Sequence, residues 1–308
     1  MKIYTLTLAP CYDMHASAEK IISGKENSVT LTSREAGGKG INISRALLSA
    51  GIESEAIIAL GSDNSEELEK ELAKIGLKTR YYRQKGRIRE NLTVHTADGG
   101  ETRISQTGFP VYQKTLDKIL SDIEIAEGDI FTFTGSAPSS LGKEDLINFI
   151  LKIKAMGAKV VIDSKSLELS DIIRISPWLI KPNEEEIAAY LSREIKDPDD
   201  ALAEAEKLYG YGIENVMISL GEIGAVLVNG DGCFFAESAK ITPISTIGAG
   251  DSTIAGFIAA KKRGFSDSDA LRLAVATGSA ACLTEGTKPP KADDIEALYK
   301  TITVRQKP

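Results

Sequence analysis

The chain has 308 residues, of which 42% are hydrophobic and 26% charged, and its formal net charge is −7. This composition is typical of a globular protein with a sizeable core, and the acidic charge disfavours nucleic acid or an anionic membrane surface as the main partner. Three widely spaced cysteines form no disulfide framework, and no stretch approaches the roughly 18 apolar residues of a membrane span. We therefore expect a cytoplasmic protein.

Short β-rich runs alternate with helical segments along most of the chain. The expected strands are Ile3–Leu8, Glu55–Leu60, Asp129–Thr134, Lys159–Ile162, Trp178–Ile180, Asn215–Ser219 and Ala225–Val228. The expected helices are Lys39–Ala50, Glu66–Ile75, Lys143–Met156, Glu184–Leu191, Asp199–Leu208, Asp251–Arg263, Asp267–Leu283 and Asp293–Lys300. This alternation predicts a parallel sheet covered by helices.

Two stretches interrupt the alternation, one from about Met14 to Glu35 and the other from about Thr79 to Ser105. Both resemble strands, and the second contains a turn sequence at Asp98-Gly99-Gly100. We expect them to form a small β-sheet of their own, which either caps a site or pairs with another subunit.

The segment Gly248-Ala249-Gly250-Asp251-Ser252 follows a β-like stretch, Ile241–Ile247, and opens a helix of small residues. Closely spaced glycines at a helix N-terminus let backbone N–H groups converge on an anion. A carboxylate in the same turn can accept a proton from an attacking hydroxyl. The alternative is structural, with Asp251 as a helix cap and the glycines as a tight turn.

Lys181-Pro182-Asn183-Glu184-Glu185-Glu186 comes directly after a short apolar run. Asn183 and Glu186 are three residues apart and face the same way on a helical turn. Oxygen ligands in this arrangement suit Mg²⁺, which keeps most of its waters. A plain helix start with acidic residues in the first turn explains the pattern equally well.

Two further glycine-rich segments could approach a ligand. Ala36-Gly37-Gly38-Lys39-Gly40-Ile41-Asn42 precedes a helix and lacks the spacing of a Walker A loop, while Ser219-Leu220-Gly221-Glu222-Ile223-Gly224 follows a strand. A loop and a hairpin turn are the structural alternatives. The two histidines, His15 and His95, form no metal-binding pair by spacing, and no nucleophile elbow is present.

Taken in order, these four segments resemble the PfkB (ribokinase-like) carbohydrate kinase family over essentially the whole chain. The resemblance implies an α/β fold: a three-layer α/β/α sandwich with a mostly parallel central sheet and a small β-sheet lid. It implies one kinase domain spanning residues 1–308, with the lid formed by about 12–36 and 79–107.

The opening Thr5-Leu6-Thr7-Leu8-Ala9-Pro10-x-x-Asp13 is similar to the phosphosugar branch of the family, as are Gly86-Arg87-Ile88-Arg89-Glu90-Asn91 and Gly135-Ser136-x-Pro138. Arg89 and Lys39 offer donors for a phosphate already on the substrate. After Gly135 the chain reads Ser136-Ala137-Pro138-Ser139-Ser140, without the glycine usual in the family, which puts the contact from Ser136 in question.

The resemblance also assigns roles to single residues. Asp251 would be the catalytic base, beside an anion hole of Gly248, Ala249 and Gly250. The substrate-binding residues would be Asp13, Gly38, Lys39, Asn42, Arg89 and Ser136. Asn183 and Glu186 would organise Mg²⁺, through water, and the ATP phosphates. The nucleotide cleft would also include Ser219, Gly221, Gly224 and Gly250.

The implied reaction transfers the γ-phosphoryl group of ATP to a ketohexose phosphate. The overall similarity favours fructose 1-phosphate as the acceptor, with tagatose 6-phosphate and fructose 6-phosphate as rivals. A nucleoside or vitamin kinase and a non-catalytic sugar-phosphate sensor are more distant alternatives. The resemblance further implies a homodimer that pairs through the lid, in which Lys25 occupies a position that can reach a neighbouring subunit's site.

Overall fold

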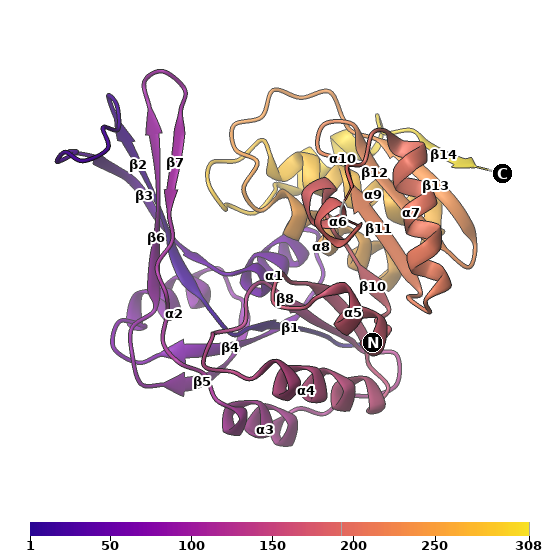
Figure 1. The fold of residues 1–308 in the computed structure, drawn as a ribbon, viewed down its shortest axis with the longest axis horizontal. Helices are drawn as coiled ribbons and strands as arrows, with labels where there is room; N and C mark the ends of the chain where they lie inside the picture. Colours follow the sequence, from indigo (N-terminus) through magenta and orange to yellow (C-terminus); the bar gives the residue numbers. More distant parts are fainter. Residues whose placement is uncertain (192, 308) are drawn as a thin grey trace.

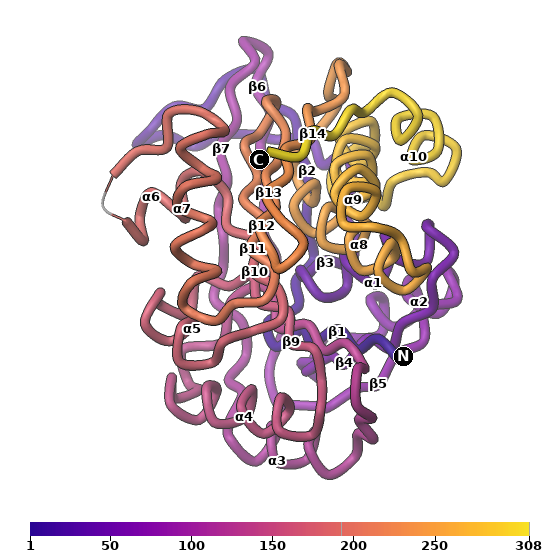
Figure 2. The backbone as a smooth tube through the Cα atoms, turned by 90° about the vertical axis from the view of Figure 1, so that its right-hand side faces the viewer, coloured from indigo at the N-terminus to yellow at the C-terminus, as the bar shows by residue number. Residues whose placement is uncertain are grey.

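The computed structural model describes residues 1–191 and 193–307. Within them, a ten-stranded sheet runs through the molecule in the order β14-β13-β12-β11-β10-β9-β8-β1-β4-β5 (Figures 1 and 2). Its strands are β1 (Ile3–Thr7), β4 (Glu55–Gly61), β5 (Lys78–Gln84), β8 (Ile130–Thr134), β9 (Lys159–Asp163), β10 (Leu179–Ile180), β11 (Asn215–Ser219), β12 (Gly224–Asn229), β13 (Gly232–Glu237) and β14 (Val304–Lys307). Neighbouring strands from β5 to β11 pair in parallel. The pairs β11–β12, β12–β13 and β13–β14 are antiparallel.

The strand order places β1 between β4 and β8, so the chain first builds the sheet outward on one side and then on the other. Every residue of β1, β4 and β8 is buried, as expected for parallel strands covered on both faces. In sheets of this kind, ligands bind outside the carboxyl ends of the strands where the order reverses. The carboxyl ends of β1 and β8 are therefore the expected location of a site.

Helices cover both faces of the sheet. The helices are α1 (Lys39–Ser49), α2 (Glu66–Lys74), α3 (Gln113–Asp122), α4 (Lys143–Ala155), α5 (Leu169–Ile175), α6 (Glu184–Leu191), α7 (Pro198–Gly210), α8 (Ala249–Lys262), α9 (Asp267–Ala281) and α10 (Ala292–Tyr299). Figure 2 shows α1, α8, α9 and α10 on one face and α3 to α7 on the other. The three-layer sandwich is therefore confirmed. In the described ranges, no helix combines the length and the apolarity that a membrane span requires.

A second sheet, in the order β3-β2-β6-β7, stands apart from the main body at the upper left of Figure 1. It consists of β2 (Cys11–Ala18), β3 (Thr30–Gly37), β6 (Arg89–Thr96) and β7 (Glu101–Ile104), and we call it the lid. Two antiparallel hairpins meet along the parallel pair β2–β6.

The second lid segment begins later than expected. Residues 78–84 form β5, which pairs with β4 at the edge of the large sheet, and the lid resumes only at Arg89. Residues 78–84 are half-buried or exposed except for Tyr82, which fits an edge strand of either sheet. The sequence alone therefore could not decide which sheet this strand joins.

The predicted strands and helices are confirmed to within a few residues, with one exception. The expected β-like stretch Ile241–Ile247 is wrong, because these residues form a loop without strand pairing. Pro243 within it removes a backbone donor, which disfavours a place in a sheet. The helices α3 and α5 and the strands β13 and β14 were not predicted.

Close helix packing positions α8, the helix that begins beside Gly248. A Cβ atom at Gly256 would lie 2.5 Å from Thr277 Oγ1 and 2.6 Å from the Leu273 carbonyl oxygen on α9. These contacts leave no room for a side chain, so α8 and α9 pack with their backbones close together.

We predict that Gly256→Ala lowers the free energy of unfolding by about 1–3 kcal/mol, because α8 has to move away from α9. The matched control is Gly210→Ala at the end of α7, where an added Cβ meets nothing within 4 Å. That variant should be neutral or more stable by up to about 1 kcal/mol. Urea unfolding of both variants measures the difference, and equal effects would contradict this account of the α8–α9 contact.

Candidate active site

A cavity of about 650 Å³ opens at the carboxyl ends of β1, β8, β9 and β10, below the lid. The predicted residues that line it are Asp13, Gly38, Lys39, Asn42, Arg89, Ser136, Asn183, Glu186, Gly248, Gly250 and Asp251. The predicted residues Ala249, Ser219, Gly221 and Gly224 are not part of this lining. One cavity therefore gathers side chains from positions 13 to 251 of the sequence.

Asp251 lies in the first turn of α8, whose N-cap is Gly248 with a φ of 81°. Its side chain is buried, and Asn42 Nδ2 donates a hydrogen bond to Oδ2 at 2.9 Å. Burial raises the pKa of Asp251 to about 6, with Asp163 adding to the increase and Lys39 opposing it. A carboxyl group with this pKa is ionised at neutral pH and is a stronger base than an ordinary aspartate.

The start of α8 supplies backbone donors next to this carboxylate. The first N–H groups of a helix have no intrahelical acceptor and lie at the positive end of its dipole. The Ala249 N–H already donates to the Thr246 carbonyl at 3.3 Å. The anion hole expected from Gly248, Ala249 and Gly250 stays a prediction, and of its three donors Ala249 already has an acceptor within the chain.

Two lysines place positive charge on the floor of the cavity. Lys39 Nζ lies 2.9 Å from Asp163 Oδ2; burial works against its charge, but Asp163 and Asp251 outweigh burial and raise its pKa to about 12. Lys181 is buried, and its Nζ would be 3.2 Å from a Cβ atom placed at Gly250. Burial raises the pKa of Asp163, yet Lys181 and Lys39 together hold it below its usual value. Lys39 therefore keeps its charge, and both lysines face the start of α8.

The lid contributes two arginines to the same cavity. Arg89 Nη2 donates to the Ala9 carbonyl at 3.3 Å, while its buried Nε has no partner. Arg103 Nη2 lies 3.5 Å from Asp13 Oδ1, which also accepts a hydrogen bond from Asn91 Nδ2 at 3.2 Å. Guanidinium groups of this kind suit a phosphate with several acceptor oxygens.

Buried polar atoms without a partner indicate where a polar ligand would bind. Asn42 Oδ1, Asn91 Oδ1 and Arg89 Nε are such atoms, and all three residues line the cavity. Their mixture of acceptors and a donor matches the hydroxyl groups and phosphate of a sugar phosphate.

The loop after Gly135 keeps Ser136 at the cavity although the usual glycine is absent. The Ala137 N–H donates to Ser166 Oγ at 2.9 Å, and Ser140 Oγ bonds both the N–H and the carbonyl of Val111 at 2.9 Å. These side-chain hydrogen bonds hold the loop in place without the glycine.

Asn183 and Glu186 cap the start of α6 reciprocally. The Glu186 N–H donates to Asn183 Oδ1 at 2.8 Å, and the Asn183 N–H donates to Glu186 Oε2 at 3.1 Å. This capping leaves Glu186 Oε1 as the oxygen available to a cation, consistent with Mg²⁺ bound through one carboxylate, water and phosphate oxygens. Among the described residues, no three His, Cys, Asp or Glu side chains converge on a dedicated metal site.

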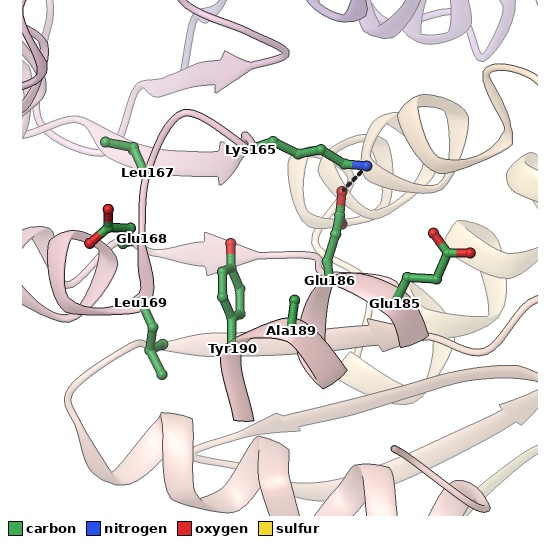
Figure 3. A pocket seen from close by; sticks show the side chains of 8 residues that line it. All are labelled: Lys165, Leu167, Glu168, Leu169, Glu185, Glu186, Ala189 and Tyr190. Carbon is green, nitrogen blue, oxygen red and sulfur yellow. Dashed lines mark ion pairs between the residues drawn. The ribbon is translucent and has the colours of Figure 1, made fainter. Parts of the chain in front are cut away.

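A second cavity, of about 560 Å³, adjoins Glu186 on its other side (Figure 3). Lys165 points its ammonium group at Glu186, with 4.0 Å between Nζ and Oε1. Burial, Glu186 and then Asp163 raise the pKa of Tyr190 on this wall to about 12, so its hydroxyl stays protonated. Lys165 is thus the cation that faces the free oxygen of Glu186.

The turn between β11 and β12 holds Ser219, Gly221 and Gly224. The Ser219 N–H donates to the Pro182 carbonyl at 3.1 Å, which places Ser219 beside the start of α6. A Cβ atom at Gly224 would be 1.9 Å from the Ala236 carbonyl oxygen, so this glycine serves the contact with β13. Nucleotide contacts at Ser219, Gly221 and Gly224 stay a prediction.

Sequence reasoning missed Arg103, Lys165 and Asp163 and gave Lys181 no role. Arg103 lies on an exposed strand and belongs to none of the four glycine-rich or acidic segments. Asp163 ends a buried strand, and a polar residue at the carboxyl end of a parallel strand is a signal that could have identified it.

The fold and this cavity define a carbohydrate kinase. The chain belongs to the pfkB family of carbohydrate kinases, whose model matches residues 6–294. It is therefore a phosphotransferase, and kinases of this family use ATP as co-substrate.

Its relatives include phosphofructokinases of two kinds. The 1-phosphofructokinase of Bacillus subtilis is 32% identical over 284 residues, which cover 92% of this chain and 93% of the relative. The ATP-dependent 6-phosphofructokinase isozyme 2 of Escherichia coli is 31% identical over 307 residues, covering 98% and 99%. The solved structure of Escherichia coli phosphofructokinase-2 with substrates and products matches with a TM-score of 0.90 at 31% identity, covering 98% and 99%.

We predict that Asp251→Asn lowers kcat roughly 10²–10⁴-fold, because the variant cannot accept the proton. In the native enzyme, kcat/KM should fall about tenfold per pH unit below about pH 6, as Asp251 becomes protonated. A pH–rate profile of both proteins tests this. Unchanged turnover in Asp251→Asn would remove this residue from the mechanism.

The same variant should be more stable than the native protein at neutral pH. The pKa of Asp251 rises from 3.8 to about 6 on folding, so the carboxylate destabilises the native state above pH 6, on the order of 2–3 kcal/mol. Urea unfolding should show this gain at pH 7.5 and its loss below about pH 4, where both states bind the proton. A less stable variant at pH 7.5 would contradict the assigned pKa.

Proposed function

We propose that this kinase transfers the γ-phosphoryl group of MgATP to a ketohexose phosphate, with fructose 1-phosphate as the preferred acceptor. The observation that supports this most is the pairing, in one cavity, of the buried base Asp251 with two lid arginines, Arg89 and Arg103. A base alone suits any sugar kinase. The arginines suit an acceptor that already carries a phosphate.

In the proposed reaction, Asp251 accepts the proton of the attacking hydroxyl while the oxygen attacks the γ-phosphorus, and the bond from that phosphorus to the β–γ bridging oxygen breaks to release ADP. The backbone N–H groups at the start of α8 stabilise the charge on the transferring group, and Lys181, which faces Gly250, adds positive charge there. The free oxygen of Glu186 would help to hold Mg²⁺, which would neutralise charge on the ATP phosphates. Asp13, Asn42 and Asn91 would hold the sugar hydroxyls.

Fructose 6-phosphate is the second candidate acceptor, and one observation favours it. The Escherichia coli 6-phosphofructokinase isozyme 2 matches 98% of this chain, a longer stretch than the 92% matched by the 1-phosphofructokinase of Bacillus subtilis. Relatives named 1-phosphofructokinase are, however, found in several organisms at about 30% identity. Both acceptors place a phosphate and a primary hydroxyl at opposite ends of one ketohexose.

We also propose that the protein forms a homodimer that pairs through the lid. We propose a cytoplasmic location for it. Large apolar side chains are exposed on the lid strands and their connecting loop at Ile21, Val29, Leu31 and Ile104. An exposed apolar group of this kind is typical of a surface that pairs with another protein. Lys25 lies in the loop between β2 and β3, from which it would reach towards the site of the second subunit.

A kinase assay across fructose 1-phosphate, fructose 6-phosphate and tagatose 6-phosphate tests the acceptor. We expect the highest kcat/KM for fructose 1-phosphate and loss of all activity when EDTA removes Mg²⁺. A clear preference for fructose 6-phosphate would establish the second candidate instead. Turnover of unphosphorylated sugars or nucleosides at similar kcat/KM would overturn the assignment to phosphosugars.

Replacing the lid arginines tests the phosphate contact. Arg89→Ala and Arg103→Ala should each raise the KM for the sugar phosphate about 10- to 100-fold, because a charge-assisted hydrogen bond contributes about 1.5–3 kcal/mol. Arg87→Ala is the matched control, since Arg87 is exposed in the same segment and does not line the cavity. Equal KM values for all three variants would exclude the arginines from substrate binding.

A further inference from the structure

The two histidines of the chain lie side by side in the lid. His15 is on β2 and His95 on β6, and Nδ1 of His15 lies 3.2 Å from Nε2 of His95. The ring planes differ by only 9° and the ring centroids are 5.5 Å apart, much farther than the two nitrogens. The rings therefore meet edge to edge through one N–H···N hydrogen bond.

A carboxylate lies near each end of the pair. His95 Nδ1 lies 3.8 Å from Glu101 Oε2 on β7. On the inner side, a Cβ atom at Gly286 would be 2.9 Å from His15 Nε2 and 3.6 Å from Glu35 Oε2, so both atoms face this one glycine. Glu35 is buried on β3, and its Oε1 has no partner.

The number of protons on the His15–His95 pair determines what the pair presents to the two carboxylates. In a neutral pair of imidazoles, one proton lies in the shared N–H···N hydrogen bond and only one proton is left for the two outer nitrogens. One outer nitrogen therefore has no proton and turns a lone pair towards the side of a carboxylate. One added proton occupies this nitrogen. The pair then carries an outward N–H group at each end, near Glu35 at one end and near Glu101 at the other, while the shared hydrogen bond is kept.

We propose that the His15–His95 pair is a proton-binding site that controls how tightly the lid holds the loop of Gly286 and Thr287 beside the anion hole. The proton comes from solvent at the exposed His95 and gives the pair one positive charge. That charge lies between Glu35 and Glu101 and attracts both. The lid is therefore held more tightly when the pair takes up this proton as the pH falls.

The loop connects this pair to the active site. Thr287 Oγ1 donates to Glu35 Oε2 at 3.3 Å, and Thr287 also lines the cavity. Ser245 Oγ donates to the Gly286 carbonyl at 3.4 Å, just before the segment that leads to Gly248. Glu35 pairs directly across from Asp13 in the lid sheet. A movement of Glu35 would therefore act on both Thr287 and Asp13, which line the cavity.

Other charged groups of the lid and the loop contribute to the electrostatic potential in which the pair binds a proton. They are Asp13 on β2, Arg103 on β7, and Glu285 with its partner Lys288 in the loop. Lys288 acts on Glu35 from the loop side, and Arg103 is paired with Asp13. These charges do not depend on the protonation of the histidines, so they shift the midpoint of the transition without removing it.

The first experiment is a pH titration of the untagged protein by ¹H–¹⁵N NMR of the imidazole groups, from pH 5 to 8.5. Only His15 and His95 contribute signals. We expect coupled titration, in which His15→Gln shifts the midpoint of His95 by about one pH unit, as for strongly interacting sites. Independent titration, with no shift in either single variant, would overturn the proposal.

The second experiment measures hydrogen exchange of residues 34–37 and 285–288 at pH 6 and pH 8, corrected for intrinsic exchange. We expect severalfold greater protection at pH 6 in the native protein and no pH difference in His15→Gln or Glu35→Gln. His95→Gln keeps the buried histidine and should reduce the difference. Thr30→Gln, exposed on the same strand as Glu35, should behave like the native protein. Equal protection at both pH values in the native protein would refute the control of the lid by this pair, whatever the substrate proves to be.

Discussion

The proposed chemistry depends on one electrostatic constraint: a buried carboxyl group has to give up its proton at neutral pH. Asp251 is almost fully enclosed, and burial alone pushes its pKa upwards. Lys39 limits the increase, and Asp163 in turn keeps Lys39 charged. The carboxylate, the two lysines and Asp163 therefore form one charge-balanced group, and none of them can be replaced without changing the others.

The sheet explains how residues so distant in the sequence form this group. Parallel strands end at the same edge, so β1, β8, β9 and β10 deliver Thr7, Thr134, Asp163 and Lys181 to one line of positions. The helix α8 then points its N-terminus at that edge. Its depth is fixed by contact with α9 at Gly256, so a packing position five residues farther along the helix sets where Asp251 lies. The lid adds two arginines, Arg89 and Arg103, to the lining of the same cavity.

Most of this fold could be predicted from the sequence, since buried parallel strands and amphipathic helices have distinct periods. The site was predictable where function needs an unusual backbone, as at Gly38 and Gly248, both with positive φ. It was not predictable where an ordinary residue becomes functional through its position. Arg103 is one of many exposed arginines in the sequence, and only the pairing of β6 with β7 brings it over Asp13. The boundary of the lid could not be predicted for a similar reason, because the sequence of β5 does not show which sheet this strand joins.

Two of the four connections between the lid and the body are very short. Only residues 8–10 separate β1 from β2, and only Gly38 separates β3 from α1. These two connections, which we call the hinges, run directly into the elements carrying Thr7 and Lys39. A compound bound at these hinges would not need to resemble ATP or a sugar phosphate in order to inhibit the enzyme. It would hold the lid at one angle to the body. Its selectivity among related kinases would come from the residues of the hinge.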